Sequence, residues 1–113
     1  MSGISTHVLD LATGRPATGI AISLARRTDT GAWATIAEGL TDGDGRIKEL
    51  FAGEALTPGR YLMTFATGTY FRGRGETSFH PEILVQFEVG DPAQHYHVPL
   101  LLSPFGYSTY RGS

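Results

Sequence analysis

The chain has 113 residues, of which 41% are hydrophobic and 18% are charged, and its formal net charge is -2. This charge gives no electrostatic case for nucleic acid or an anionic membrane, and no apolar run approaches the roughly 20 residues of a membrane helix. Because there is no cysteine, disulfides and cysteine zinc sites are excluded. The length predicts a single domain over residues 1–113, and the absence of a visible signal peptide favours a cytoplasmic protein.

Alternating apolar and polar residues predict three strands in the first part of the chain. These runs cover residues 4–11, 20–27 and 33–38. In the first run, His7 and Leu9 share one face of the strand, and Thr6 and Val8 share the other. Clusters of glycine, proline and threonine between the runs are typical of turns in an all-β protein.

The strongest turn is TDGDG at residues 41–45, because Asp-Gly supplies the positive φ that tight hairpins require. Its two aspartates resemble the start of a calcium loop, but the later oxygen ligands and the closing glutamate are missing, which disfavours calcium. The next strand is expected at residues 46–51. A regular strand here places Arg46, Lys48 and Leu50 on one face.

The rest of the chain predicts four more strands and one short helix. The strands are expected at residues 59–66, 82–89, 95–102 and 105–111, and the helix at residues 69–73. In the strand over residues 82–89, Leu84 interrupts the polar face, as a residue at an interface would. About eight short strands at this spacing predict an all-β fold, an antiparallel sandwich of two sheets with at most one short helix.

Residues 95–113, HYHVPLLLSPFGYSTYRGS, carry apolar and aromatic side chains with almost no charge. Chain ends usually fray, so this composition predicts burial in the domain, in a subunit interface or in a site. Its last four residues, Tyr110 to Ser113, bring together a phenol, a guanidinium and a hydroxyl.

Histidines are the main reactive side chains of this sequence. His95 and His97 are two residues apart on a predicted strand, so their side chains share a face. They could be half-buried residues with satisfied hydrogen bonds, or they could bind zinc together with His7. They could also act without a metal, as general bases near neutral pH. The spacing alone leaves all three interpretations open.

Two long stretches resemble the signatures of the transthyretin-like proteins that act as 5-hydroxyisourate hydrolases. THVLDLATGRPA, at residues 6–17, resembles their N-terminal signature, and residues 95–113 resemble their C-terminal signature, including YRGS. The DGR at residues 44–46 fits as well. The resemblance covers essentially the whole chain.

The resemblance implies a transthyretin-like sandwich of eight strands and one short helix. It implies a homotetramer with active sites in the channel between dimers. The implied reaction opens the six-membered ring of 5-hydroxyisourate and yields 2-oxo-4-hydroxy-4-carboxy-5-ureidoimidazoline, a step in urate degradation. No metal and no organic cofactor are implied.

The resemblance also assigns candidate residues. The catalytic candidates are His7, Arg46 and His97, and the substrate-binding candidates are His7, Arg46, Tyr110, Arg111 and Ser113. We favour His97 as the base that activates water, with His7 as its partner or as a substrate ligand. Arg46 would hold the developing negative charge, and His95 is the weaker candidate.

Two other functions compete with this interpretation. One is a transthyretin-type carrier that binds a small molecule in the channel without catalysis. The other is a zinc-dependent hydrolase that uses His7, His95 and His97. The YRGS ending, which transthyretin itself lacks, favours the metal-free enzyme over both.

Overall fold

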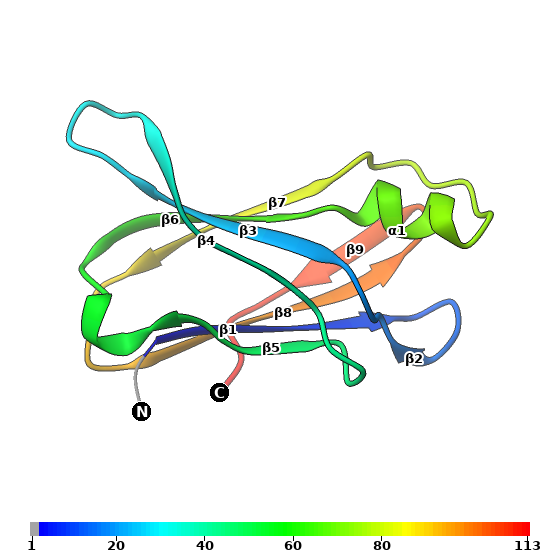
Figure 1. Ribbon diagram of the computed structural model, residues 1–113, viewed down its shortest axis with the longest axis horizontal. Coiled ribbons are helices and arrows are strands. Elements are labelled where there is room, and N and C mark those ends of the chain that lie inside the picture. The colour runs from blue at the N-terminus through cyan, green and yellow to red at the C-terminus, as the bar shows by residue number, and fades with distance from the viewer. Residues whose placement is uncertain (1–2) are drawn as a thin grey trace.

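The computed structural model describes residues 3–113 as two β-sheets packed face to face (Figure 1). The first sheet holds β5 (Arg46–Ala52), β1 (Gly3–Asp10), β8 (His95–Ser103) and β9 (Gly106–Thr109), with the short β2 (Arg15–Pro16) also beside β1. The second sheet holds β4 (Trp33–Leu40), β3 (Ala21–Arg27), β6 (Gly59–Phe65) and β7 (Ile83–Val89). A 3-10 turn, η1 (Gly53–Ala55), precedes β6, and one helix, α1 (Thr67–Gly73), follows it.

The all-β sandwich with one short helix is confirmed. The helix begins two residues earlier than expected, and the last strand is shorter, because its continuous pairing with β8 covers only Gly106–Thr109. No helix within residues 3–113 is long and apolar enough to cross a membrane.

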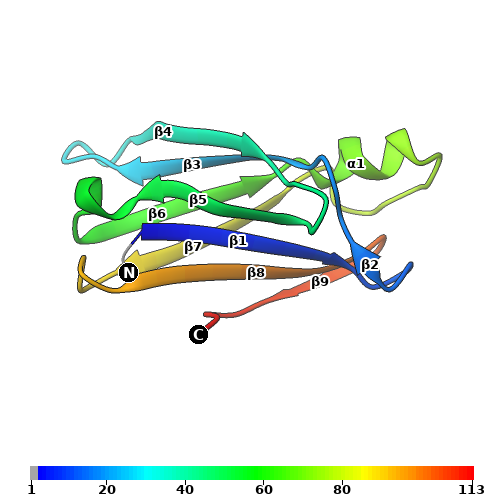
Figure 2. The same ribbon diagram turned by 60° about the horizontal axis from the view of Figure 1, so that its bottom comes forward.

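The prediction that all strands are antiparallel is wrong for one pair. β1 and β8 run parallel, from Gly3 opposite His95 to Asp10 opposite Leu102. Local alternation looks the same in a parallel and an antiparallel strand, so the sequence pattern could not distinguish them. The segment between these strands contains the entire second sheet, and this is the long crossover that a parallel pair requires. Figure 2 shows β5, β1, β8 and β9 side by side in one layer.

The core between the sheets determines which face of β1 and β8 remains for a site. Even-numbered residues of both strands point inward, and the apolar ones are fully or almost fully buried. They are Ile4, Val8, Tyr96, Val98, Leu100 and Leu102. Full burial of such a side chain contributes about 1.5–3 kcal/mol. Because side chains alternate along a strand, the odd-numbered Ser5, His7, His95 and His97 are held on the outer face of the first sheet.

β5 is not a regular strand, so the prediction that Arg46, Lys48 and Leu50 share one face is wrong. Ile4 pairs with Phe51 but Thr6 pairs with Ile47, so two residues of β1 lie opposite four residues of β5. This bulge separates Leu50, which is buried in the core, from Arg46 and Lys48, which line a hollow on the outer surface. The three side chains therefore do not share a face.

The turn before β5 fixes the position of Arg46, the first residue of that strand. Oδ1 of Asp42 accepts hydrogen bonds from the backbone N–H groups of Asp44, at 2.9 Å, and Arg46, at 3.0 Å. These bonds lower the pKa of the Asp42 carboxyl, with the bond from Arg46 as the main cause. Gly45 has a φ of 74°, and its carbonyl accepts a hydrogen bond from the N–H of Val8 at 2.8 Å. The positive φ expected of this turn is thus confirmed at its last glycine.

We expect Gly45→Ala to lower the free energy of unfolding by about 2 kcal/mol or more, measured by urea denaturation. The left-handed φ strains any residue with a Cβ, and a Cβ here would lie 2.5 Å from the carbonyl oxygen of Val8. Gly43→Ala is the matched control, because a Cβ at Gly43 meets nothing within 4 Å. Equal stability of the two variants would show that this turn is not under the predicted constraint.

Candidate functional site

A hollow of about 240 Å³ lies on the outer face of the first sheet. Residues of β1, β5, β8 and the C-terminal segment line it. They are Ser5, Thr6, Arg46, Lys48, His95, His97 and Ser113. All the ionisable side chains in this set are basic, so the hollow is suited to an anionic or oxygen-rich ligand.

Strand register brings residues together that are far apart in the sequence. His7 of β1 lies opposite Arg46 of β5, and on the other side of β1, Ser5 lies opposite His97 of β8. Directly opposed side chains on one face of a sheet lie within contact range. The central strand β1 therefore joins the DGR turn to the His-x-His strand.

The hydroxyl of Ser5 connects the two histidines of β8. Its Oγ lies 2.7 Å from Nε2 of His95 and 2.8 Å from Nδ1 of His97. The predicted shared face of His95 and His97 is thus confirmed. Nε2 of His97 is the ring nitrogen that remains for a ligand in the hollow.

His97 is held in its neutral form at neutral pH. Burial lowers the pKa of the imidazole below the ordinary histidine value of 6.5, and the nearby Arg46, His7 and His95 lower it further. A neutral imidazole with a free nitrogen can accept a proton from water. Burial, together with the nearby basic groups, therefore prepares His97 to act as a base.

The C-terminal segment packs directly on His97. The N–H of Gly112 donates to the carbonyl oxygen of His97 at 2.8 Å, which forms an antiparallel bridge between the two residues. A Cβ on Gly112 would lie 2.5 Å from Cδ2 of the His97 ring. Only glycine allows the chain to approach the imidazole this closely.

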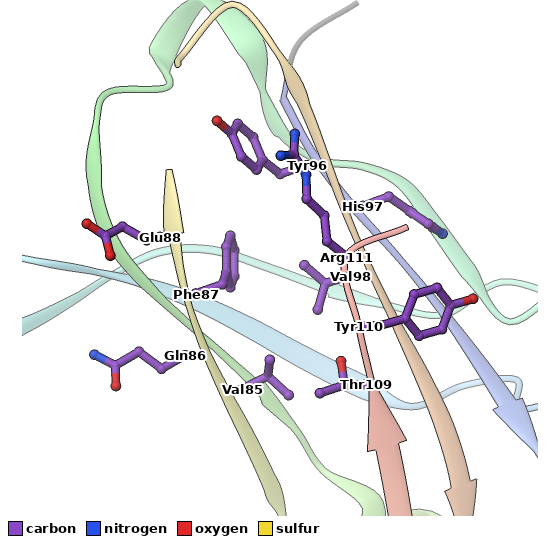
Figure 3. Close-up of a pocket in the computed structure, with 10 residues that line it drawn as sticks. All are labelled: Val85, Gln86, Phe87, Glu88, Tyr96, His97, Val98, Thr109, Tyr110 and Arg111. Atoms are coloured by element: carbon purple, nitrogen blue, oxygen red, sulfur yellow. The ribbon is translucent and has the colours of Figure 1, made fainter. Parts of the chain in front are cut away.

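Two predicted site residues lie elsewhere. Tyr110 and Arg111 line a second hollow, between β7 and the β8–β9 pair, which shares His97 with the first. Figure 3 shows Arg111 directed toward Tyr96, whereas His97 and Tyr110 point to the other side of their strands. The Arg111 guanidinium lies 4.4 Å from the centre of the Tyr96 ring and donates to Gln94 Oε1 at 2.9 Å. The structure thus places Arg46, His97 and Ser113 in one hollow and Tyr110 and Arg111 in the adjoining one. His7 does not line either hollow but lies opposite Arg46 in the strand register.

Sequence reasoning missed Ser5 and Lys48, although a local signal existed for both. Ser5 precedes His7 by two residues and Lys48 follows Arg46 by two, so alternation alone places each on the face of its neighbour. Within residues 3–113, no three His, Asp or Glu side chains form a group that could hold a metal ion. His7, His95 and His97 are therefore not arranged as a ready zinc site.

A comparison with family models identifies the family of this chain. A family model described as the HIUase/Transthyretin family matches residues 4–112. The chain belongs to this family. Its members share the sandwich described above, and the matched region includes every residue of the hollow except Ser113.

The individual relatives include proteins named 5-hydroxyisourate hydrolase and a protein named transthyretin. A 5-hydroxyisourate hydrolase of Salmonella dublin is 49% identical over 97% of this chain and 80% of its own length. The structure of Klebsiella pneumoniae 5-hydroxyisourate hydrolase superposes with a TM-score of 0.88, at 41% identity over 100% of both chains. Transthyretin from Sparus aurata superposes with a TM-score of 0.94, at 34% identity over 99% of this chain and 97% of its own. The fold is common to both groups, so the fold alone does not distinguish them.

Burial is the main cause of the lowered His97 pKa, and the added effect of the Arg46 charge can be tested without substrate. In Arg46→Gln, a positive charge beside the imidazole is lost, so we expect the pKa of His97 to rise toward 6.5. Titration of the ring signals by NMR measures this value in both proteins. Arg60→Gln, an equal change on the second sheet, is expected to leave the titration unchanged. An unaltered His97 titration midpoint in Arg46→Gln would show that the Arg46 charge does not lower the pKa of His97.

Proposed function

We propose that this protein hydrolyses 5-hydroxyisourate to 2-oxo-4-hydroxy-4-carboxy-5-ureidoimidazoline in urate degradation. The observation that carries the proposal is one hollow that combines a His97 of lowered pKa with Arg46 and the C-terminal segment. Relatives named 5-hydroxyisourate hydrolase, at up to 49% identity over nearly the whole chain, support it.

The bond to be broken is a cyclic amide, so water must be activated. Neutral His97 takes a proton from water while the water oxygen forms a bond to the amide carbonyl carbon. Positioned proton transfer of this kind typically contributes 10²–10⁴-fold to a rate. A histidine with a lowered pKa is unprotonated in the physiological range, as a base must be.

Attack converts the carbonyl oxygen into an oxyanion. Arg46 offers planar, permanently charged donors to this oxygen, and Lys48 adds a second positive charge to the same hollow. The carbon–nitrogen bond then breaks, and the proton taken from water passes from the imidazolium to the leaving nitrogen. The products are a ureido N–H and a carboxylic acid, which releases its remaining proton to solvent near neutral pH to become the carboxylate.

The remaining candidates are assigned to binding. His7, opposite Arg46, either shares the proton with His97 or contacts the substrate ring. Ser113 lines the same hollow. Tyr110 and Arg111 border the adjoining hollow, from which they would hold the far edge of the substrate.

We further propose a cytoplasmic homotetramer of single-domain subunits. Among residues 3–113, β7 and β9 each pair with one neighbour only, and unpaired edges of this kind tend to be covered by another chain. Exposed apolar side chains lie on or beside these edges, including Leu84, Phe79, Phe105 and Tyr107. Light scattering after size exclusion should give four times the mass of the 12.2 kDa chain; a monomer would contradict the assembly.

The main alternative is a carrier, which the likeness to Sparus aurata transthyretin favours. Ultraviolet absorbance of freshly generated 5-hydroxyisourate, with protein far below the substrate concentration, distinguishes the two. An enzyme converts many equivalents faster than the spontaneous reaction, whereas a carrier leaves the rate unchanged. Repeating the assay with a chelator tests the zinc-dependent alternative, because that enzyme would lose activity.

A further inference from the structure

The side chain of Ser5 is placed as a link between two imidazoles. Ser5 is only 6% exposed, and its Oγ contacts Nε2 of His95 at 2.7 Å and Nδ1 of His97 at 2.8 Å. The other ring nitrogen of His95, Nδ1, is buried and has no partner among residues 3–113. Within the described chain, Ser5 is therefore the hydrogen-bond partner that orients the His95 ring, and it is also bonded to His97.

The hydroxyl makes the protonation of the two rings interdependent. A serine hydroxyl has one hydrogen to donate, and a neutral imidazole has one N–H and one bare nitrogen. When Ser5 donates to one ring, the other ring must donate its own N–H to Oγ to form a second hydrogen bond. The two bonds can also coexist when both rings donate their N–H to Oγ and the hydroxyl hydrogen points elsewhere, because the oxygen has two acceptor lone pairs. Each of these three arrangements fixes the tautomer of both histidines.

We propose that Ser5 is a positioning residue that determines which nitrogen of His97 acts as the base. In the active arrangement, Nδ1–H of His97 donates to Oγ of Ser5, and the hydroxyl donates to Nε2 of His95. Nε2 of His97 is then left without a proton. The inference rests on the proposed function, because activation of water in the hollow requires this bare nitrogen.

The hydrogen bond between Ser5 and His97 also holds the imidazole in place while water attacks the amide. The proton from water is bound by Nε2 of His97 as the new oxygen–carbon bond forms, and the imidazolium keeps its Nδ1–H on Oγ of Ser5. The proton on Nε2 is later given to the leaving nitrogen. Ser5 gains and loses nothing in this cycle; it holds the ring in one orientation, as the orienting group of a catalytic histidine does.

Proton–nitrogen correlation spectra of the nitrogen-labelled free protein test the assignment directly. We expect His97 to carry its proton on Nδ1 in the wild-type protein, and both tautomers to be populated in Ser5→Ala. With 5-hydroxyisourate as substrate, Ser5→Ala should lower kcat about tenfold, the scale of one lost hydrogen bond, with KM nearly unchanged. Ser5→Thr, which keeps a hydroxyl, should restore both the tautomer and kcat.

Ser23→Ala, the same change on the second sheet, is the matched control and should alter neither readout. A wild-type spectrum with the proton on Nε2 of His97 would overturn the proposal, whether or not any variant folds. Unchanged tautomer and kcat in Ser5→Ala would overturn it as well. If the tautomers behave as expected but the wild-type protein does not speed ring opening, the coupling is supported and the proposed function fails.

Discussion

Replacing His97 with asparagine lowers the rate of 5-hydroxyisourate ring opening by about 100- to 10,000-fold, the range for loss of a general base. Asparagine keeps a polar side chain of similar reach on β8, but it cannot take up a proton near neutral pH. His97 lines the hollow beside Arg46 and Ser113, and its lowered pKa keeps it ready to accept one. The decay of ultraviolet absorbance, corrected for the spontaneous reaction, measures the effect.

His80→Asn is the control for this change. His80 lies against Phe79 and Tyr107 and does not line either hollow that includes His97, so the same replacement there should leave the rate unchanged. Full activity in His97→Asn would remove His97 from the mechanism. Equal losses in both variants would instead indicate a general effect of replacing a histidine.

The second large effect is expected from a single methyl group at Gly112. In Gly112→Ala, the Cβ would lie 2.5 Å from Cδ2 of His97 and 3.2 Å from Cγ of Pro99. Either the imidazole or the C-terminal segment must move, and a displacement of about 1 Å can cost about 100-fold in rate. We therefore expect kcat/KM to fall about 100-fold, while thermal unfolding changes little because Gly112 lies outside the core.

Gly106→Ala provides a matched change in the same part of the chain. A Cβ at Gly106 would approach no atom closer than Oγ of Ser103, at 3.8 Å, which is ordinary contact. We expect this variant to keep its activity. If Gly112→Ala were equally active, close packing of the C-terminal segment on His97 would not be needed for catalysis.

Much of the fold could be read from local patterns. Alternation placed the strands within a few residues, and the two-residue spacing correctly put His95 and His97 on one face. Resemblance at both ends of the chain then supplied the family and the candidate residues. These signals are local or motif-based, so they depend little on how distant strands pair.

The parts that could not be predicted all depend on long-range pairing. The contact of Ser5 with His97 requires a parallel register between strands about ninety residues apart, which no local pattern encodes. The bulge that separates Leu50 from Arg46 arises from the pairing of β5 with β1. The direction of Arg111 is likewise set by Tyr96 and Gln94, through a cation–π contact and a hydrogen bond.

The central claim is that the hollow formed by His97, Arg46 and Ser113 binds the reacting ring. A crystal structure with a non-hydrolysable analogue of 5-hydroxyisourate tests it most directly. The account predicts the ring within hydrogen-bond distance of Nε2 of His97 and of the Arg46 guanidinium, about 3 Å. A ring bound only between β7 and β9, or on the outer face of the second sheet, would contradict it.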